Sequence, residues 1–254
     1  MKYKLKKIKA IYQLGKDTMS NSFHIDALNK NILEKKKGPI RTDVINYLVK
    51  QFDRDIHYLE IGVRYPEHNF NKINATYKYS VDPGVENQEN PVEFKLTSDA
   101  FFKSIREGQI LNSTIKFDII FIDGLHLADQ VEKDIINSLE FLNDDGFVIL
   151  HDCNPPTEFH ARESYNYFLS PAKGAWNGTT WKAFFKFRLV KEYYSCCIDS
   201  DWGIGIISKK INLGVSSKIH NPYFEYQIFN DTRKESLNLM SFEEFQAKVE
   251  TKSN

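Results

Sequence analysis

The sequence predicts an α/β fold with a doubly wound, mostly parallel sheet. Short apolar segments alternate with amphipathic ones over residues 40–152, which is the pattern of repeated βαβ units. Two of the apolar segments, FDIIFID (117–123) and GFVILHD (146–152), are continuous, as expected of strands covered by helices on both faces. Each ends in an aspartate, and right-handed crossovers bring the carboxyl ends of such strands to one edge of the sheet.

The first elements of this pattern begin with a helix. Residues 40–52 place apolar side chains on one helical face, and HYLEIGV (57–63) is a short buried strand. We expect a further helix near NFNKINATY (69–77). KYSVDPG (78–84) then predicts a second strand, which ends at Asp82 before a Pro-Gly turn.

The later elements complete the alternation. Residues 93–97 predict a short third strand before a helix capped by Ser98, and residues 126–142 have the spacing of an amphipathic helix. EYYSCCIDSDWGIGIIS (192–208) predicts a hairpin with a tight polar turn, and one or two helices follow it. The chain thus divides into an N-terminal helical and basic extension (1–38), one domain (39–212) and a C-terminal helical extension (213–254).

The composition argues against a polyanionic partner. The 34 basic and 34 acidic residues leave no net charge, so nucleic acid is not expected. Basic runs over residues 1–9 and 34–38 could contact a phosphate, a membrane or another subunit, although a solvated surface is the simpler explanation. Three cysteines form no disulfide framework or zinc motif, which fits a cytoplasmic protein, and no apolar run could span a membrane. The two extensions could form a lid or pair subunits in a homo-oligomer.

Polar residues follow the predicted strands where an open α/β sheet binds its ligand. Gly62, in YLEIGVRYP, lets backbone approach a ligand or simply serves a turn, and the later glycines of a GxGxxG signature are absent. Asp82 can accept hydrogen bonds from both hydroxyls of a ribose, or favour the turn that follows it. Ser98 and Asp99 could meet an adenine edge or cap a helix.

Five motifs in order carry a family resemblance: YLEIGV, VDPG, TSDAFF, FDIIFIDGLH and DDGFVILHDCNP. Together they resemble the class I S-adenosylmethionine-dependent methyltransferases, within them the small-molecule and sugar O-methyltransferase-like group with an I-D-G-x-H motif. The resemblance covers residues 40–210. It implies a Rossmann-like methyltransferase fold, with seven strands and a terminal antiparallel hairpin. The sequence departs from the family at Pro66, where E-x-G-x-x-x-G has its second glycine.

The resemblance also implies where S-adenosylmethionine is bound. The residues that match its cofactor motifs lie at the predicted strand ends and at the start of one helix. They are Glu60 and Gly62 at the methionine and ribose end, Asp82 at the ribose, Ser98 and Asp99 beside the adenine, and Asp123, which closes the fourth strand.

Methylation of a hydroxyl requires a base to remove its proton, and histidine suits that task near neutral pH. The resemblance implies that His126 is this base and that Asp123 and Asp152 hold Mg²⁺ or another divalent cation, with Asp152 also positioning the acceptor. Cys153 stands where metal-dependent members carry a further Asp or Asn, so a reaction without metal stays open. We expect His151 on the opposite side of its strand from Asp152, as a packed side chain.

The acceptor pocket is expected after the fifth strand, among Trp176, Trp181, Lys182 and Arg188. Tryptophan faces suit a sugar or aromatic ring, and Lys and Arg suit a phosphate or carboxylate, unless this segment is a helix that packs its tryptophan and phenylalanines onto the sheet. Trp176, which lies in a loop, is expected at the pocket rim. The sequence therefore predicts an O-methyltransferase for a small polar acceptor, such as a sugar or glycan precursor. Two alternatives remain: a non-catalytic methyltransferase-like scaffold protein, and an NAD-dependent oxidoreductase on the same fold.

Overall fold

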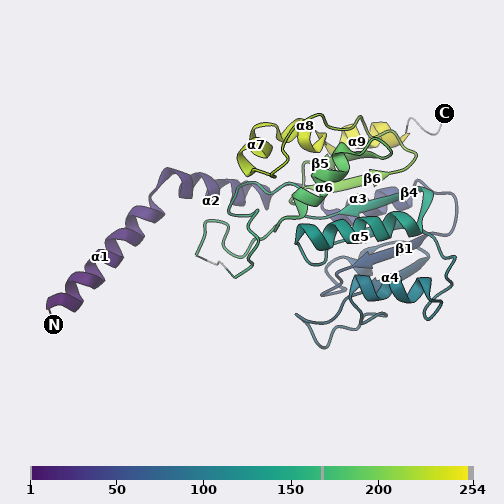
Figure 1. Ribbon diagram of the computed structural model, residues 1–254, viewed down its shortest axis with the longest axis horizontal. Coiled ribbons are helices and arrows are strands. Elements are labelled where there is room, and N and C mark those ends of the chain that lie inside the picture. Colours follow the sequence, from purple (N-terminus) through teal and green to yellow (C-terminus); the bar gives the residue numbers. More distant parts are fainter. Residues whose placement is uncertain (1, 167–168, 251–254) are drawn as a thin grey trace.

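The chain folds around a seven-stranded sheet, seen in the computed structural model that describes residues 2–166 and 169–250 (Figure 1). The strand order is β2-β1-β3-β4-β6-β5-β7. Strands β1 to β4 are parallel, whereas β6 runs antiparallel between β4 and β5. The strands are β1 (His57–Ile61), β2 (Tyr77–Val81), β3 (Phe117–Ile122), β4 (Leu142–Leu150), β5 (Tyr194–Ile198), β6 (Ile204–Ser208) and β7 (Leu239–Met240).

Helices cover both faces of this sheet. Residues of α4, α5 and α6 join the buried cluster on one face, and residues of α3 and α9 join the cluster on the other. The predicted fold class, a doubly wound α/β sheet, is confirmed. The helices are α1 (Lys2–Met19), α2 (Ser22–Glu34), α3 (Arg41–Val49), α4 (Ser98–Arg106), α5 (Ala128–Phe141), α6 (Thr180–Leu189), α7 (Tyr226–Asp231), α8 (Arg233–Leu237) and α9 (Phe242–Glu250).

Strand β3 shows why its apolar run is continuous. All six of its residues are buried. Ile120 and Ile122 join the core beside α4 and α5, whereas Ile119 and Phe121 join the core beside α3 and α9. Successive side chains of a strand point to opposite faces, so a strand covered on both faces needs apolar residues at nearly every position.

The topology creates a switch point between β1 and β3. The chain passes from β1 to β2 on one side and then places β3 on the other side of β1. Gly62 follows β1 with a φ of 94°, and a Cβ atom there would overlap the carbonyl group of Asp123, which follows β3. The Asp123 amide in turn donates to the Ile61 carbonyl at 2.9 Å. Strand ends at such a point form the ligand crevice of open α/β sheets.

The predicted third strand, residues 93–97, does not form. A single bridge joins Phe94 to Val81 at the edge of the sheet. The Leu96 amide then donates back to the Phe94 carbonyl at 2.9 Å, which turns the chain away before a second bridge can form. The count of seven strands is nevertheless correct, because β7 pairs with β5 at the opposite edge.

Two helix predictions also need correction. Only a 3-10 turn, Phe70–Lys72, forms where a helix near residues 69–77 was expected. Asparagines favour turns and caps over helix interiors, and Asn69 directs its side chain to Glu60 instead. Helix α4 does begin at Ser98, but its N-cap is Thr97, whose hydroxyl accepts from the Ala100 amide.

The hairpin that the sequence predicts over residues 192–208 is confirmed. Strands β5 and β6 pair antiparallel, and the turn between them holds Asp201, Trp202 and Gly203 at positive φ. The Gly203 and Trp202 carbonyls accept the amides of Cys153 and Asn154, at 3.0 and 2.9 Å. This pairing anchors the hairpin turn beside the carboxyl end of β4.

The two ends of the chain behave differently. Helices α7 to α9 and β7 pack on the body, and Phe245 of α9 is fully buried in the core. Helix α1 extends away from the body, and α2 joins it to the sheet (Figure 1). Within residues 2–166 and 169–250 no helix is long and apolar enough to cross a membrane.

Replacing Gly62 with alanine should lower the free energy of unfolding by roughly 3 kcal/mol. About 1–2 kcal/mol comes from a left-handed backbone at a residue with a Cβ atom. About 1–3 kcal/mol more comes from overlap with the Asp123 carbonyl group. Urea unfolding followed by circular dichroism measures the loss.

Gly108→Ala is the matched control, because Gly108 also has a positive φ but no atom lies within 4 Å of the place that a Cβ would take there. It should lose only about 1–2 kcal/mol. Equal losses for the two variants would contradict the close packing of β1 against β3.

Candidate active site

Three polar side chains converge at the switch point. Asp123 follows β3, His126 lies in the next loop, and Asp152 follows β4. Nε2 of His126 lies 3.4 Å from Oδ1 of Asp123, and its Nδ1 lies 3.2 Å from Oδ2 of Asp152. One ligand atom from each residue falls within 4.8 Å of the others. The sequence expectation that strand ends would gather these residues is therefore met.

His151 also joins this group, so its expected position away from Asp152 is wrong. Nδ1 of His151 lies 3.1 Å from Asp123 Oδ1 and 3.2 Å from Asp152 Oδ2. Strand β4 ends at Leu150, and Asp152 has a φ of 62°. This left-handed residue ends the alternation of side chains that a strand would impose. Both side chains consequently lie on the same side.

Two residues of the cluster were not predicted. Arg41, the first residue of α3, places Nη1 2.8 Å from Nε2 of His151 and 3.2 Å from Oδ2 of Asp201. The Arg41 amide also donates to Asp201 at 2.8 Å. A basic residue in the first turn of a helix opposes the helix dipole, and that mismatch was the one sequence signal for Arg41.

Charge is balanced within this cluster. Burial alone would lower the pKa of His126, but the Asp152 and Asp123 carboxylates raise it to about 9. The pKa of His151 rises well above its ordinary value for the same reason. Burial would raise the pKa of Asp123, yet the two imidazoles hold it low, and His151 and Arg41 lower that of Asp201 to about 2. The site is built from paired opposite charges.

Glu60, in strand β1, has a hydrogen-bond network of its own. Its Oε2 atom accepts from the Tyr58 hydroxyl at 2.5 Å and from the Asn69 amide at 2.9 Å. Asn69 is held by the Thr42 hydroxyl, at 2.7 Å. Burial raises the pKa of Glu60 to about 7. This carboxyl group is oriented by protein partners and is only 4% exposed.

The remaining predicted cofactor residues lie farther along the edge. Oδ1 of Asp82 accepts from the Gly84 amide at 2.6 Å, the arrangement of a turn aspartate. Nε2 of Gln130 binds Ser98 at 3.2 Å and Asp99 at 3.3 Å, which ties the start of α4 to α5. No contact among the described residues joins Ser98 or Asp99 to the cluster.

A cavity of about 350 Å³ opens beside the cluster. Trp176, expected at the rim of the acceptor pocket, stacks on His126 with ring centroids 5.1 Å apart and lines this cavity. Trp181 and Arg188 do not line it: both are buried in the packed helix α6, the alternative that the sequence left open, and Arg188 donates to backbone carbonyls. The lining residues are Lys35, Arg41, His151, Asp152, Gly174, Ala175, Trp176 and Trp202.

The end of helix α2 lies beside this cavity, because Lys35, its C-cap residue, lines it. Glu34 accepts from the Trp202 amide at 3.1 Å. His160, fully buried, binds Thr157 through Nδ1 at 2.8 Å and Asn31 through Nε2 at 3.2 Å. These contacts fasten the loop after β4 to helix α2.

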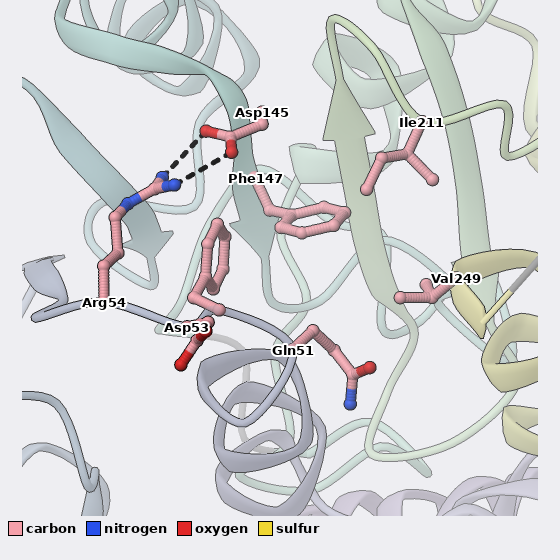
Figure 2. A pocket seen from close by; sticks show the side chains of 8 residues that line it. Gln51, Asp53, Arg54, Asp145, Phe147, Ile211 and Val249 are labelled. Atoms are coloured by element: carbon pink, nitrogen blue, oxygen red, sulfur yellow. Dashed lines mark hydrogen bonds and ion pairs between the residues drawn. The ribbon is translucent and has the colours of Figure 1, made fainter. Parts of the chain in front are cut away.

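A second cavity, of about 260 Å³, lies near the start of β4, at the opposite end of that strand from the crevice (Figure 2). Both oxygens of Asp145 accept from Arg54, at 2.8 and 2.9 Å. Arg54 also binds buried Asp118, at 2.5 Å, and Phe52 and Phe147 complete the wall. The charged groups here satisfy one another, which marks a structural ion pair rather than a reactive site.

Comparison with known proteins defines the class. Residues 50–153 match a family described as a methyltransferase domain. This match identifies residues 50–153 as a methyltransferase domain, and the doubly wound sheet with its antiparallel hairpin is a Rossmann-like fold that fits it. No curated protein matches the chain.

Among solved structures, the chain is similar to the O-methyltransferase from Bacillus cereus in complex with SAH. Identity is 14%, the TM-score is 0.42, and the alignment covers 78% of this chain and 95% of that one. It is also similar to the MycE methyltransferase of the mycinamycin biosynthetic pathway, in complex with Mg, SAH and mycinamycin VI. There identity is 12%, the TM-score is 0.42, and coverage is 79% of this chain and 57% of that one. Likenesses this distant transfer no residue role.

His160 should make the stability of the protein depend on pH. Burial lowers its pKa to about 4 from an ordinary value of 6.5. Between these values the unfolded chain binds a proton that the folded chain does not, so stability falls as pH drops from about 6.5 to 4. The loss should reach about 2–3 kcal/mol. Urea unfolding across this range measures it.

His160→Gln keeps a polar side chain that cannot titrate, and it should flatten the pH dependence in this window. His220→Gln, at an exposed position, is the control and should follow the parent protein. An unchanged slope in His160→Gln would contradict a buried neutral imidazole.

Proposed function

We propose that this protein transfers a methyl group from S-adenosylmethionine to a hydroxyl of a small polar acceptor, a sugar or glycan precursor. The observation that carries the proposal is the convergence of Asp123, His126 and Asp152 at the switch point of a methyltransferase domain. Methyl transfer to oxygen needs an aligned acceptor and a base for its proton, and this group offers both.

The methyl donor would lie along the carboxyl ends of β1 and β2, beside Gly62. Asp82 supports this placement, because a turn amide uses only its Oδ1 atom and no partner of Oδ2 exists in the described part of the chain. That oxygen can accept from a ribose hydroxyl. Ser98 and Asp99, at the start of α4, would meet the adenine. Glu60 would contact the methionine and ribose end of the donor through Oε1, the oxygen that its partners in the described chain leave free.

The donor set of the cluster fits a divalent cation. Two carboxylates and an imidazole within 4.8 Å of one another suit such an ion. The amide nitrogen of Asn177 donates to Asp152 at 2.7 Å, while its buried oxygen has no partner among the residues described. We assign Asp123 and Asp152 as the ligands of Mg²⁺ or a similar ion. When bound, the ion would polarise the acceptor hydroxyl.

His126 would take the proton of the acceptor hydroxyl. Its ring is fixed by stacking on Trp176 and by the Trp176 carbonyl, 3.0 Å from Nδ1. The pKa of about 9 means that the ring carries a proton at neutral pH while both carboxylates face it. With a cation bound to the Asp123 and Asp152 oxygens, His126 would lose this proton and become neutral, the form in which it can act as a general base.

The acceptor would occupy the cavity beside Asp152. Its volume of about 350 Å³ suits a small molecule. Trp176 and Trp202 offer flat apolar surfaces of the kind that pack on sugar rings, while Lys35 and Arg41 add positive charge. These walls support a small polar acceptor.

Asp82→Ala should weaken binding of S-adenosylhomocysteine at least about tenfold, which corresponds to 1.4 kcal/mol. The variant removes the proposed acceptor of the ribose hydroxyls. Isothermal titration calorimetry of the full chain measures the affinity. Asp144→Ala is the control, because that side chain is 96% exposed near the start of β4, at the opposite end of the strand from the crevice, and it should bind as the parent does.

No binding of S-adenosylhomocysteine to the parent protein would refute the methyl donor. It would leave the scaffold and the oxidoreductase, and titration with NADH separates these two.

The variants His126→Ala and Asp152→Asn should distinguish the general base from the metal ligand. Loss of a general base lowers turnover by roughly 10²–10⁴-fold. Asp152→Asn should lose Mn²⁺ affinity as well, whereas His126→Ala should keep it. Calorimetry with Mn²⁺ and a methyl-transfer assay over a panel of monosaccharides and sugar phosphates provide the two readouts.

His220→Ala, at an exposed position, is the matched control and should change neither. Loss of Mn²⁺ affinity in His126→Ala would make this histidine a metal ligand instead of the base. Full turnover in that variant would exclude both roles.

A further inference from the structure

Helix α1 is an amphipathic helix that no other part of the described chain covers. Every side chain from Tyr3 to Ser20 is exposed, and the helix extends away from the body (Figure 1). Burial of an apolar helix face normally stabilises a helix in water, so an 18-residue helix whose side chains are exposed from Tyr3 onward calls for a partner. Neither the proposed methyl transfer nor its site accounts for α1.

Five of the seven large apolar residues of α1 lie along one face, and Tyr3 and Leu14 lie outside it. We call this face the apolar stripe; at 3.6 residues per turn its members lie within about 120° of one another. Each is between 60% and 72% exposed. The stripe consists of Leu5, Ile8, Ile11, Tyr12 and Met19.

Lysines border the apolar stripe on both sides. On the same helical geometry Lys9 and Lys16 follow one edge and Lys7 the other, while Lys4 lies in the first turn at the N-terminal end of the stripe. Residues 3–19 hold five lysines and one aspartate, while the whole chain is neutral, so this segment has an excess of four positive charges and the remainder four negative. No ion pair of these lysines occurs in the described structure.

We propose that α1 binds an anionic lipid surface, lying in the interface with the apolar stripe toward the acyl chains. The lysines at its borders would reach the lipid phosphates, as long basic side chains do at membrane interfaces. Helices with one apolar face, a lysine-rich polar face and low overall hydrophobicity bind in this way without crossing the bilayer.

Other partners fit the same surface less well. A nucleic acid would match the lysines and leave the apolar stripe in water. Pairing of two α1 helices through their stripes would set lysine against lysine, because lysines stand at both borders and Asp17, the one acidic residue of α1, lies away from them. An anionic bilayer satisfies both the charge and the apolar face.

Sedimentation of the full chain with lipid vesicles tests the proposal. At 0.1 M salt, binding to phosphatidylcholine vesicles with a quarter phosphatidylglycerol should exceed binding to pure phosphatidylcholine at least tenfold. Raising the salt to 0.5 M should remove most of this difference, because counterions screen the lysines. Equal binding to both vesicles, or no binding to either, would overturn the proposal.

Two sets of variants assign the effect to α1. One triple variant replaces the border lysines: Lys7→Gln, Lys9→Gln and Lys16→Gln. It should reduce vesicle binding at least tenfold, because each charge near the surface contributes about fivefold to the affinity. Leu5→Gln with Ile8→Gln should reduce binding equally. Since α1 contributes nothing to the core, all variants should melt as the parent does by circular dichroism.

Matched substitutions elsewhere on the surface are the controls. Lys50→Gln with Lys191→Gln and Lys210→Gln removes three exposed charges from the body. Val85→Gln with Val215→Gln removes two exposed apolar side chains, 80% and 82% exposed. Both should bind vesicles as the parent does.

Vesicle binding that persists in the α1 variants would overturn the assignment. An oligomer that the same α1 variants dissociate, with no vesicle binding, would show by analytical ultracentrifugation that a second copy covers α1 instead. The vesicle assay needs no acceptor and no methyl donor. A failure of the proposed methyl transfer would therefore leave the membrane-binding result unchanged, and the two proposals can fail separately.

Discussion

The close approach of backbone between the ends of β1 and β3 sets the geometry on which the site depends. Gly62 has room only because it lacks a Cβ atom, and it brings Asp123 to the point where the strand order reverses. Gly178 repeats this device: its φ is 59°, and a Cβ there would overlap the carbonyl oxygen of His126. Two glycines therefore fix the backbone of two site residues, one from each side of the crevice.

The side chains held there form a balanced group of charges. Asp123, Asp152 and Asp201 face His126, His151 and Arg41, and none of the carboxylates is left unpaired in low-dielectric surroundings. In the proposed metal-bound state, a divalent cation would meet the same carboxylate oxygens that the imidazoles face, and its charge would replace that of their protons. Charge balance by protons or by metal is the physical reason that three carboxylates can share one buried edge.

Local sequence patterns were sufficient for β1 to β6 and for the residues at their ends, but they predicted a strand at residues 93–97 that does not form and did not predict β7. Continuous apolar runs located β3 and β4, and the aspartates that end them meet at the switch point as expected. Arg41 and Asp201 could not be placed in the same way, because they reach the site from a helix start and a hairpin turn, through tertiary packing. His151 was misplaced because the alternation of strand side chains stops at the left-handed Asp152.

A crystal structure of the protein grown with S-adenosylhomocysteine and Mn²⁺, with anomalous data at the manganese edge, tests the central claim most directly. The account predicts a manganese peak between the carboxylates of Asp123 and Asp152, with the ribose of the bound nucleoside against Asp82. Nucleoside bound along β1 and β2 without manganese at these carboxylates would contradict the metal assignment. A nucleoside bound elsewhere, away from the switch point, would contradict the site itself.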